Sequence, residues 1–253
     1  MNASHNVQNI AKDSLNVFND PRLFFDEYKH EYYVGTKKLI SVTKFIHEFF
    51  EHFDDVEVAK KISQMPKYVE QGITSEMLIE KWKNIRTDGT FVHKAIEDWI
   101  LSKKENNNIK FLNARSFLQS FIKDSDELHP EVKVYSVDLG VAGTIDLVIK
   151  RGNTIILVDW KTNTEIRKDA FNKKTGILPP TSNVPDSNYW HYTLQLNLYK
   201  HILERDYGLK VDELILVHLR EENFKHYIMP VVPELIKAMV AYKKHQNVLT
   251  SFG

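Results

Sequence analysis

Cysteine is absent from the chain, and this absence excludes several kinds of site. Without thiols there is no disulfide framework, no thiolate-bound zinc, no thiolate-held iron–sulfur cluster and no cysteine nucleophile. Any metal centre in this protein must therefore use other donors.

The chain also lacks an excess of charge of either sign, because 34 Lys and Arg residues balance 34 Asp and Glu residues. This balance argues against a passive nucleic-acid coat, although a local basic groove remains open. Only 9 glycines and 8 prolines occur among 253 residues, so each of their turn signals is informative. Hydrophobic residues make up 42% of the chain, which suits a sizeable core and excludes wholesale disorder.

No apolar run approaches the roughly 20 residues that a membrane helix needs. The N-terminal stretch, residues 1–18, has no apolar signal-peptide core, and Asp13 is out of place in an Arg-rich transit peptide. We therefore expect a soluble, intracellular protein.

Hydrophobic periodicity divides the chain into a helical first part and a strand-rich second part. Aromatic residues at helical spacing predict a core-facing stripe, which consists of Phe45, Phe49, Phe53 and Val56. Further helices are expected near 54–65, over 75–102 with a break at 87–89, and over 111–124, 189–206 and 233–248. Strands are expected over 131–138, 142–150, 154–161, 213–219 and 225–231, with a polar loop over 163–188.

This order of elements indicates one mixed α/β, or α+β, domain over residues 1–253. Residues 1–105 are expected to be mainly helical, and residues 130–231 are expected to hold the sheet. A boundary near 105–110 remains open, but two independent domains are not expected.

The second and third predicted strands carry two aspartates at matching positions. Gly152 and Asn153 form a two-residue hairpin signal, and this register places Asp146 opposite Asp159. Directly opposed residues share a face of the sheet, with Cβ atoms about 4.5–5.5 Å apart. Lys161 lies two residues beyond Asp159 and points the same way, whereas Trp160 points to the other face.

Two carboxylates that interrupt apolar strands repel each other unless a proton, a cation or a metal ion intervenes. Carboxylate oxygens suit Mg²⁺ or Mn²⁺, and a neighbouring lysine fits metal-assisted hydrolysis of a phosphodiester. The spacing equally allows a plain salt bridge between Asp146 and Lys161 at a solvent-facing end of the sheet.

Four sequence blocks resemble the RecB-like branch of the PD-(D/E)XK nuclease superfamily. In chain order they are Gly89-Thr90-Phe91-Val92-His93-Lys94-Ala95-Ile96-Glu97, Gly143-Thr144-Ile145-Asp146, Val158-Asp159-Trp160-Lys161-Thr162 and Gln195-Leu196-Asn197-Leu198-Tyr199. More loosely, the upstream Leu39-Ile40-Ser41-Val42-Thr43 is similar to viral, phage and mitochondrial-type exonucleases of this branch. The resemblance implies a restriction-endonuclease-like core, in which helices flank a mixed central sheet after a helical N-terminal region.

The resemblance also implies roles for individual residues. Asp146, Asp159 and His93 would bind Mg²⁺ or Mn²⁺, and Glu131 falls where some members carry a further acidic residue. Lys161 would be the catalytic lysine, and Gln195 and Tyr199 would support the site or contact the DNA backbone. Trp160 replaces a more frequent tyrosine, with little expected consequence.

Each of these roles has a structural alternative. His93 can be a buried, hydrogen-bonded histidine, and Glu131 a surface charge at the end of a strand. Gln195 and Tyr199 can form a polar edge on a helix that packs on the sheet. Glu97 is expected to be structural or solvated.

Basic residues of the loop after the third strand are candidate DNA contacts, in company with Phe171. They are Arg167, Lys168, Lys173 and Lys174. The alternative is an ordinary solvated loop, since acidic residues lie within it. The aromatic residues that open the next helix, Tyr192 among them, could pack the loop down or stack on single-stranded DNA.

The whole pattern predicts a metal-dependent deoxyribonuclease. The expected activity is that of an exonuclease that processes DNA ends or single strands in replication, recombination or repair. Two alternatives remain open: a structure-specific endonuclease on the same core, and a nucleic-acid-binding module without turnover.

Overall fold

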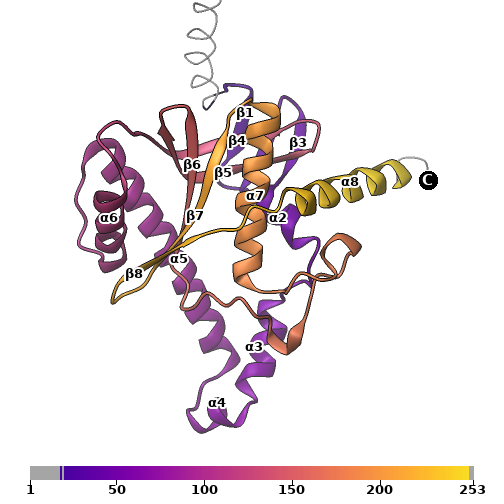
Figure 1. Cartoon of the computed structure of the whole chain (residues 1–253). Helices are drawn as coiled ribbons and strands as arrows, with labels where there is room; N and C mark the ends of the chain where they lie inside the picture. The colour runs from indigo at the N-terminus through magenta and orange to yellow at the C-terminus, as the bar shows by residue number, and fades with distance from the viewer. Residues whose placement is uncertain (1–17, 19, 251–253) are drawn as a thin grey trace, which may run out of the picture.

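A computed structural model of the chain describes residue 18 and residues 20–250 (Figure 1). Apart from Phe18, the stretch expected to lack a signal peptide lies outside the described residues. Within the described part, no helix combines the length and the apolar character that crossing a bilayer would require.

A single eight-stranded mixed sheet forms the centre of the molecule. Its strands follow the order β1-β2-β3-β5-β6-β7-β8, and β4 pairs with β5 off this path. Two pairings are parallel, β3 with β5 and β6 with β7, and the others are antiparallel. The strands are β1 (Leu23–Asp26), β2 (Glu31–Val34), β3 (Lys37–Ser41), β4 (Glu127–Ser136), β5 (Val141–Arg151), β6 (Thr154–Lys161), β7 (Val211–Leu219) and β8 (Phe224–Ile228).

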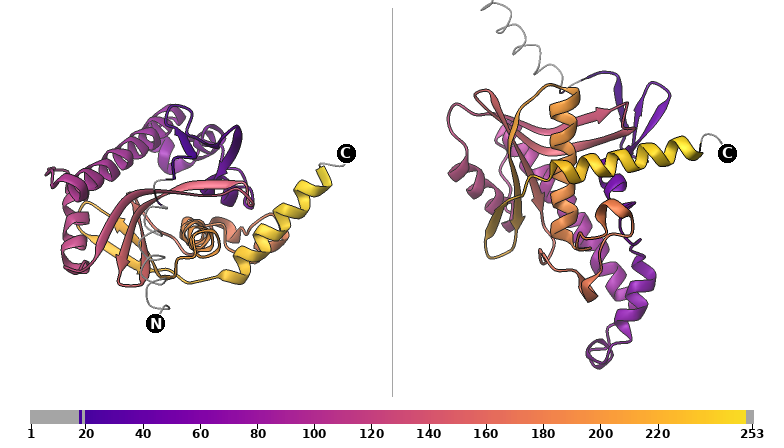
Figure 2. Two further views of the ribbon diagram at one scale, coloured as in Figure 1. Left: turned by 90° about the horizontal axis from the view of Figure 1, so that it is seen from above. Right: turned by 45° about the vertical axis from the view of Figure 1, so that its right-hand side comes forward.

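Helices cover both faces of this sheet, as Figure 2 shows in the view from above. One core cluster packs α7 against strand residues such as Leu157 and Leu216. The other packs α5 and α6 against Val158 and Trp160. The helices are α2 (Val42–His47), α3 (Asp55–Ser63), α4 (Pro66–Glu70), α5 (Ser75–Ser102), α6 (Ile109–Phe121), α7 (Asn188–Asp206) and α8 (Pro233–Thr250). The prediction of a mixed sheet flanked by helices is confirmed.

The predicted hairpin of β5 and β6 is confirmed in its register. Gly152 turns the chain with a φ of 60°, and the pairs run as far as Leu147 opposite Val158. The next positions along the two strands are Asp146 and Asp159. The two faces also separate as expected, because alternate residues of β6 belong to different core clusters.

Three strands between residues 23 and 41 were not predicted. They form two antiparallel pairs, and Val34 lies opposite Lys37 around a tight turn at Gly35 and Thr36. β-Branched and aromatic residues such as Tyr32 favour strands, and the glycine adopts the positive φ that the turn needs. These strands extend the sheet on the side of β5 through β3.

The predicted break in the helix over 75–102 is wrong, because α5 runs unbroken from Ser75 to Ser102. The Thr87 hydroxyl donates to the Lys83 carbonyl one turn earlier and so stays within the helix. A Cβ on Gly89 would lie 2.9 Å from Thr162 Oγ1. Gly89 therefore marks the close approach of the helix to the end of β6.

The predicted aromatic stripe is confirmed in its first half only. Phe45 and Phe49 are buried, whereas Phe53 and Val56 are exposed. The helix that carries Phe45 ends at His47, so the periodicity does not continue into α3. The loop over 163–188 contains two short 3₁₀ helices, η2 (Phe171–Lys173) and η3 (Pro179–Thr181).

Candidate active site

The predicted site residues come from five elements of the fold. The central strands β4, β5 and β6 and the helices α5 and α7 supply them, and α5 and α7 cover opposite faces of the sheet. Their positions are Glu131 on β4, Asp146 on β5, Asp159 and Lys161 on β6, His93 on α5, and Gln195 and Tyr199 on α7.

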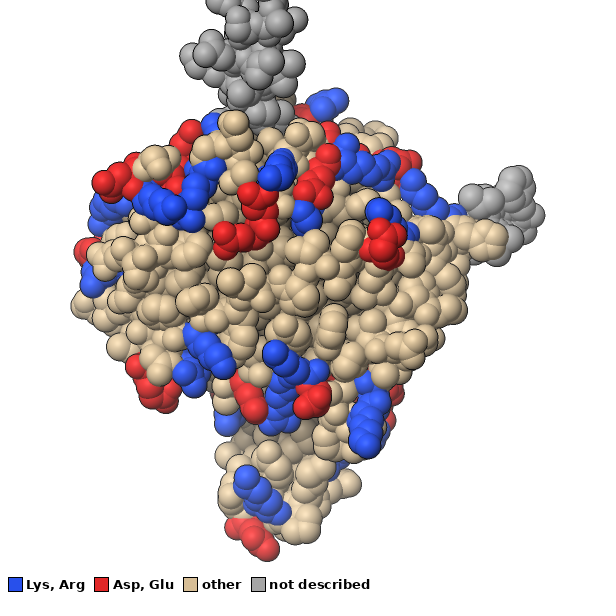
Figure 3. Space-filling model, in the orientation of Figure 1, with Lys and Arg blue, Asp and Glu red and all other residues tan. Residues whose placement is uncertain are grey.

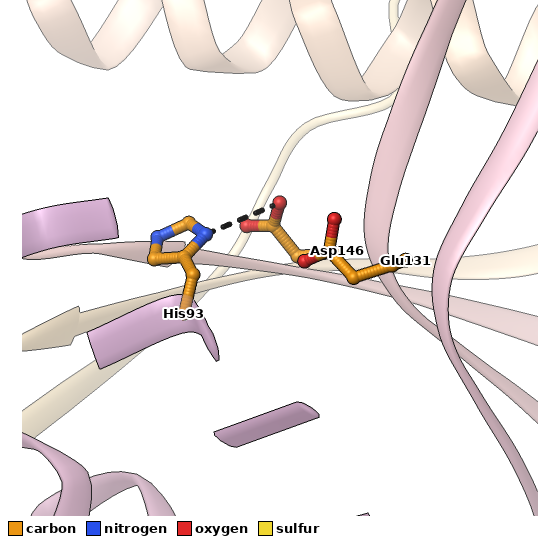
Figure 4. Close-up of side chains that lie close together, drawn as sticks. All are labelled: His93, Glu131 and Asp146. Carbon is orange, nitrogen blue, oxygen red and sulfur yellow. Dashed lines mark ion pairs between the residues drawn. The ribbon is translucent and has the colours of Figure 1, made fainter. Parts of the chain in front are cut away.

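Three of these side chains form a cluster that we call the carboxylate–histidine cluster: His93, Glu131 and Asp146 (Figure 4). One donor atom from each residue lies within 4.8 Å of the other two. His93 Nδ1 lies 3.5 Å from Asp146 Oδ1. All three side chains are partly shielded from solvent.

The main chain of Trp160 orients two members of this cluster. The Trp160 amide donates to Asp146 Oδ2 at 2.8 Å, and the Trp160 carbonyl lies 3.1 Å from His93 Nε2. A carbonyl oxygen only accepts hydrogen bonds, so Nε2 carries a proton and Nδ1 is the nitrogen that faces Asp146. The Trp160 ring points to the face of the sheet opposite to Asp159 and Lys161, as the alternation predicted, and is buried there against Phe117.

Charge in the cluster is balanced between its members. Burial lowers the pKa of His93, but the Asp146 carboxylate outweighs burial, and the pKa lies above its usual value. Burial raises the pKa of Asp146, yet His93 holds it below the ordinary range. Each charge therefore stabilises the other: Asp146 favours the protonated form of His93, and His93 favours the ionised form of Asp146.

Glu131 has an unusual backbone as well as an unusual carboxyl group. Its φ is +51°, and the β4–β5 pairing passes from Pro130 to Val132 without it. A left-handed conformation at a non-glycine residue costs on the order of 1–3 kcal/mol and often marks a functional position. Burial first, and then the neighbouring Asp146, raise the pKa of Glu131 to about 7.

Asp159 and Lys161 form a second pair beside the cluster. Lys161 Nζ lies 2.6 Å from Asp159 Oδ2, and Gln195 Nε2 donates to Oδ1 at 3.2 Å. The buried Oδ2 accepts no properly directed hydrogen bond within the described residues. Burial raises the pKa of Asp159 to about 6 although Lys161 opposes it, and Asp146 raises it further.

The ammonium of Lys161 stays charged. Burial lowers its pKa, but Asp159 and Asp146 more than compensate, so the pKa lies above its usual value. The alternative of a solvent-facing Asp146–Lys161 bridge does not describe this arrangement. Lys161 pairs with Asp159, Asp146 pairs with His93, and the two aspartate side chains are only 4% and 13% exposed.

Tyrosines hold the strand that carries Asp146. The Tyr199 hydroxyl donates to the Thr144 carbonyl at 2.8 Å, and a Cβ on Gly143 would lie 2.6 Å from that hydroxyl. The glycine two residues after the start of β5 thus makes room for the Tyr199 ring. Tyr32 on β2 bonds the Thr144 hydroxyl at 3.0 Å. Sequence analysis missed Tyr32 because it lies in an unpredicted strand.

The residues present fit a divalent cation. Carboxylate oxygens and one imidazole nitrogen converge, and such donors bind divalent metal ions. Burial and the neighbouring Asp146 carboxylate raise the pKa of Glu131, as expected for carboxylates that lie close together in a partly buried site. Asp159 is not a member of the three-residue group, whereas Glu131 is.

The four basic loop residues differ in their partners. Arg167 pairs with Glu165 at 2.7 Å, Lys174 pairs with Glu51, and Lys168 Nζ lies 5.0 Å from the centre of the Tyr189 ring. Lys173 has no ion pair with any described residue. None of these contacts involves the carboxylate–histidine cluster. On the face drawn in Figure 3, basic and acidic side chains are interspersed.

Comparison with known proteins gives one clear family match. No curated protein matches the chain. Among solved structures, SSO0001 is 13% identical with a TM-score of 0.33, and the match covers 82% of this chain and 83% of that one. A candidate exonuclease from Eubacterium rectale is 12% identical with a TM-score of 0.36, covering 81% and 77%.

The profile of the PD-(D/E)XK nuclease superfamily matches residues 27–250. That span includes the carboxylate–histidine cluster, the Asp159–Lys161 pair and the supporting residues of α7. Nucleases of this superfamily act on nucleic acids and use divalent metal ions. This chain belongs to the PD-(D/E)XK nuclease superfamily.

Proposed function

We propose that this protein is a metal-dependent deoxyribonuclease that hydrolyses phosphodiester bonds with Mg²⁺ or Mn²⁺. The observation that carries the proposal is the Asp159–Lys161 pair, 2.6 Å apart, beside the cluster of His93, Glu131 and Asp146. A binding module without turnover has no need of a buried, charged lysine next to crowded carboxylates. The superfamily match supports the same reaction class.

We assign the cation to His93, Glu131 and Asp146, with Asp159 as a further donor. A bound divalent cation supplies Lewis acidity, which lowers the pKa of water and neutralises charge on phosphate oxygens. Asp146 and His93 are held in place by the Trp160 main chain, so little reorganisation is needed when the cation binds. Oxygen-rich donors favour Mg²⁺ or Mn²⁺.

We assign to Lys161 the stabilisation of charge that develops on the scissile phosphate, or the placement of the attacking water. Its ammonium is charged and only 18% exposed, so its field acts where water screens it weakly. Gln195 supports it indirectly by holding Asp159, and Tyr199 supports the strand of Asp146.

DNA cleavage tests this assignment directly. Labelled DNA should be degraded with Mn²⁺ and left intact with EDTA, and Asp159→Ala or Lys161→Ala should abolish cleavage with the fold preserved. Lys150→Ala is a matched control, because Lys150 is also a strand lysine paired with a carboxylate, that of Glu127 at 3.0 Å. Cleavage at the wild-type rate by the first two variants would refute the proposal.

We further propose that the enzyme is an exonuclease of the RecB-like branch, acting on DNA ends or single strands in replication, recombination or repair. The order of the four motif blocks supports this, as does their similarity to viral, phage and mitochondrial-type exonucleases. Linear DNA should be degraded while covalently closed circular DNA persists. Cutting of the closed circle would instead indicate an endonuclease, and DNA binding without cleavage would indicate a binding module.

For the DNA contact we propose the loop tip at Phe171 and Lys173. Phe171 is 72% exposed, and Lys173 is exposed without an ion pair among described residues, whereas Arg167, Lys168 and Lys174 already have partners. Lys173→Ala should weaken DNA binding in EDTA. It should also reduce the slope of log affinity against log salt concentration by about one, the change expected for one lost phosphate contact.

Lys210→Ala is the control for this loop-tip prediction. Lys210 precedes β7, whose start lies beside Ile155, and Asp159 and Lys161 lie at the opposite end of β6. An equal effect of both lysine substitutions on DNA affinity would refute the assignment of the loop tip.

A further inference from the structure

One face of α7 contacts three different residues of the site strands. Tyr192, Gln195 and Tyr199 are spaced at i, i+3 and i+7, which places them on one side of the helix. Tyr199 donates to the main chain of β5, and Gln195 donates to Asp159. The third residue is Lys161, whose Nζ lies 4.7 Å from the centre of the Tyr192 ring.

We propose that Tyr192 is a positioning residue, whose aromatic face holds the ammonium of Lys161 in the position that catalysis requires. The proposal rests on the proposed function, because it gives Tyr192 a role through the lysine of that site. Tyr192 touches no reacting atom itself, and it precedes the Gln195–Tyr199 block identified in the sequence.

Lys161 needs such a support because its side chain is long and flexible. Its ion pair is with Asp159 Oδ2 at 2.6 Å, and that oxygen is also a candidate donor for the divalent cation. A carboxylate drawn toward a cation holds the lysine less well. An aromatic face attracts an ammonium through its quadrupole and cannot act as a ligand for a hard cation, so its hold on Lys161 does not depend on metal binding.

The packing of Tyr192 suits this role better than base stacking. The ring is half-buried and packs against the core cluster beneath α7. The ammonium of Lys161 already lies over one face of the ring, so a base cannot stack on that face. The Tyr192 hydroxyl makes no hydrogen bond to any described residue, so the ring itself is the functional part.

The test replaces the ring and measures kcat and KM separately on single-stranded DNA with Mn²⁺. Tyr192→Phe keeps the aromatic face and should stay within about twofold of wild type. Tyr192→Leu and Tyr192→Met remove it and should lower kcat about 10–30-fold, with KM within about twofold. Mn²⁺ affinity, measured by calorimetry, should be unchanged in all three.

Tyr227→Leu is the matched control, because Tyr227 is also half-buried beneath a lysine, with Lys225 Nζ 4.8 Å from its ring centre on β8. It should leave kcat unchanged. Two aliphatic variants are used so that a folding defect in one, seen as a lost thermal transition, leaves the other to decide.

Three results would overturn the inference: an unchanged kcat in folded aliphatic variants, an equal loss in Tyr192→Phe, or a raised KM at constant kcat. The last would assign the ring to substrate stacking. Failure of the proposed function looks different, because wild-type protein would then not cleave DNA, or Lys161→Ala would cleave it normally.

Discussion

The Glu131→Gln substitution should stabilise the metal-free protein at pH 8 and weaken its binding of a divalent cation. Burial and Asp146 raise the pKa of Glu131 from 4.5 to about 7. The folded protein therefore binds this proton more tightly than the unfolded chain does. Stability contributed by the protonated form is intact below pH 4.5, is lost as the pH rises toward 7, and stays lost above it.

The size of the effect follows from the shift in pKa. A change from 4.5 to about 7 corresponds to ~3 kcal/mol, and partial exposure of Glu131 screens some of it, so we expect ~1–2 kcal/mol. Glutamine is neutral at every pH and nearly isosteric. It should therefore match wild type at pH 4.5 and exceed it in free energy of unfolding at pH 8.

Urea unfolding in EDTA, from pH 4.5 to 8, measures this difference. Glu127→Gln is the control on the same strand, where an exposed carboxylate pairs with Lys150, and it should stay within ~0.5 kcal/mol. Saturating Mn²⁺ should reverse the order, since wild type gains more from metal binding than the variant does. A Glu131→Gln variant less stable than wild type at pH 8, or a difference independent of pH, would refute the reasoning.

Two further predictions concern packing and metal binding. Gly143→Ala should lower the free energy of unfolding in urea by ~1–3 kcal/mol and lower activity, because the new Cβ would lie 2.6 Å from the Tyr199 hydroxyl. Gly89→Ala should lower the free energy of unfolding less, since only the movable Thr162 hydroxyl opposes the new Cβ. An equal cost for both glycines would contradict this. His93→Ala should weaken Mn²⁺ binding more than ~10-fold, as measured by calorimetry. Asp98→Asn, which changes a residue of the same helix that pairs with Lys94, should leave the affinity unchanged. Equal Mn²⁺ affinities of the two variants would count against His93 as a ligand.

Local signals were enough to predict the central hairpin. The Gly-Asn turn set the register, and the alternation of β6 placed Asp159 and Lys161 on one face and Trp160 on the other. These features depend only on neighbours in sequence, so a single chain reveals them. The mixed sheet flanked by helices followed from the order of elements.

Long-range contacts account for what the sequence did not reveal. Gly89 suggested a break because glycine is a weak helix former. Its close approach to Thr162 was not predicted, because Thr162 is distant in sequence. The left-handed backbone of Glu131 was not predicted, because it departs from the strand pattern that surrounds it. The contact of Tyr192 with Lys161 depends on how α7 docks on the sheet, which periodicity alone does not fix.

Crystals soaked in Mn²⁺, measured at the manganese absorption edge, test the central claim most directly. The account predicts an anomalous peak bounded by His93 Nδ1 and the carboxylates of Glu131 and Asp146, with Asp159 within reach. It also predicts that Lys161 stays over the Tyr192 ring when the ion is bound. A saturated crystal with no peak there, or with manganese held by other residues, would contradict the account.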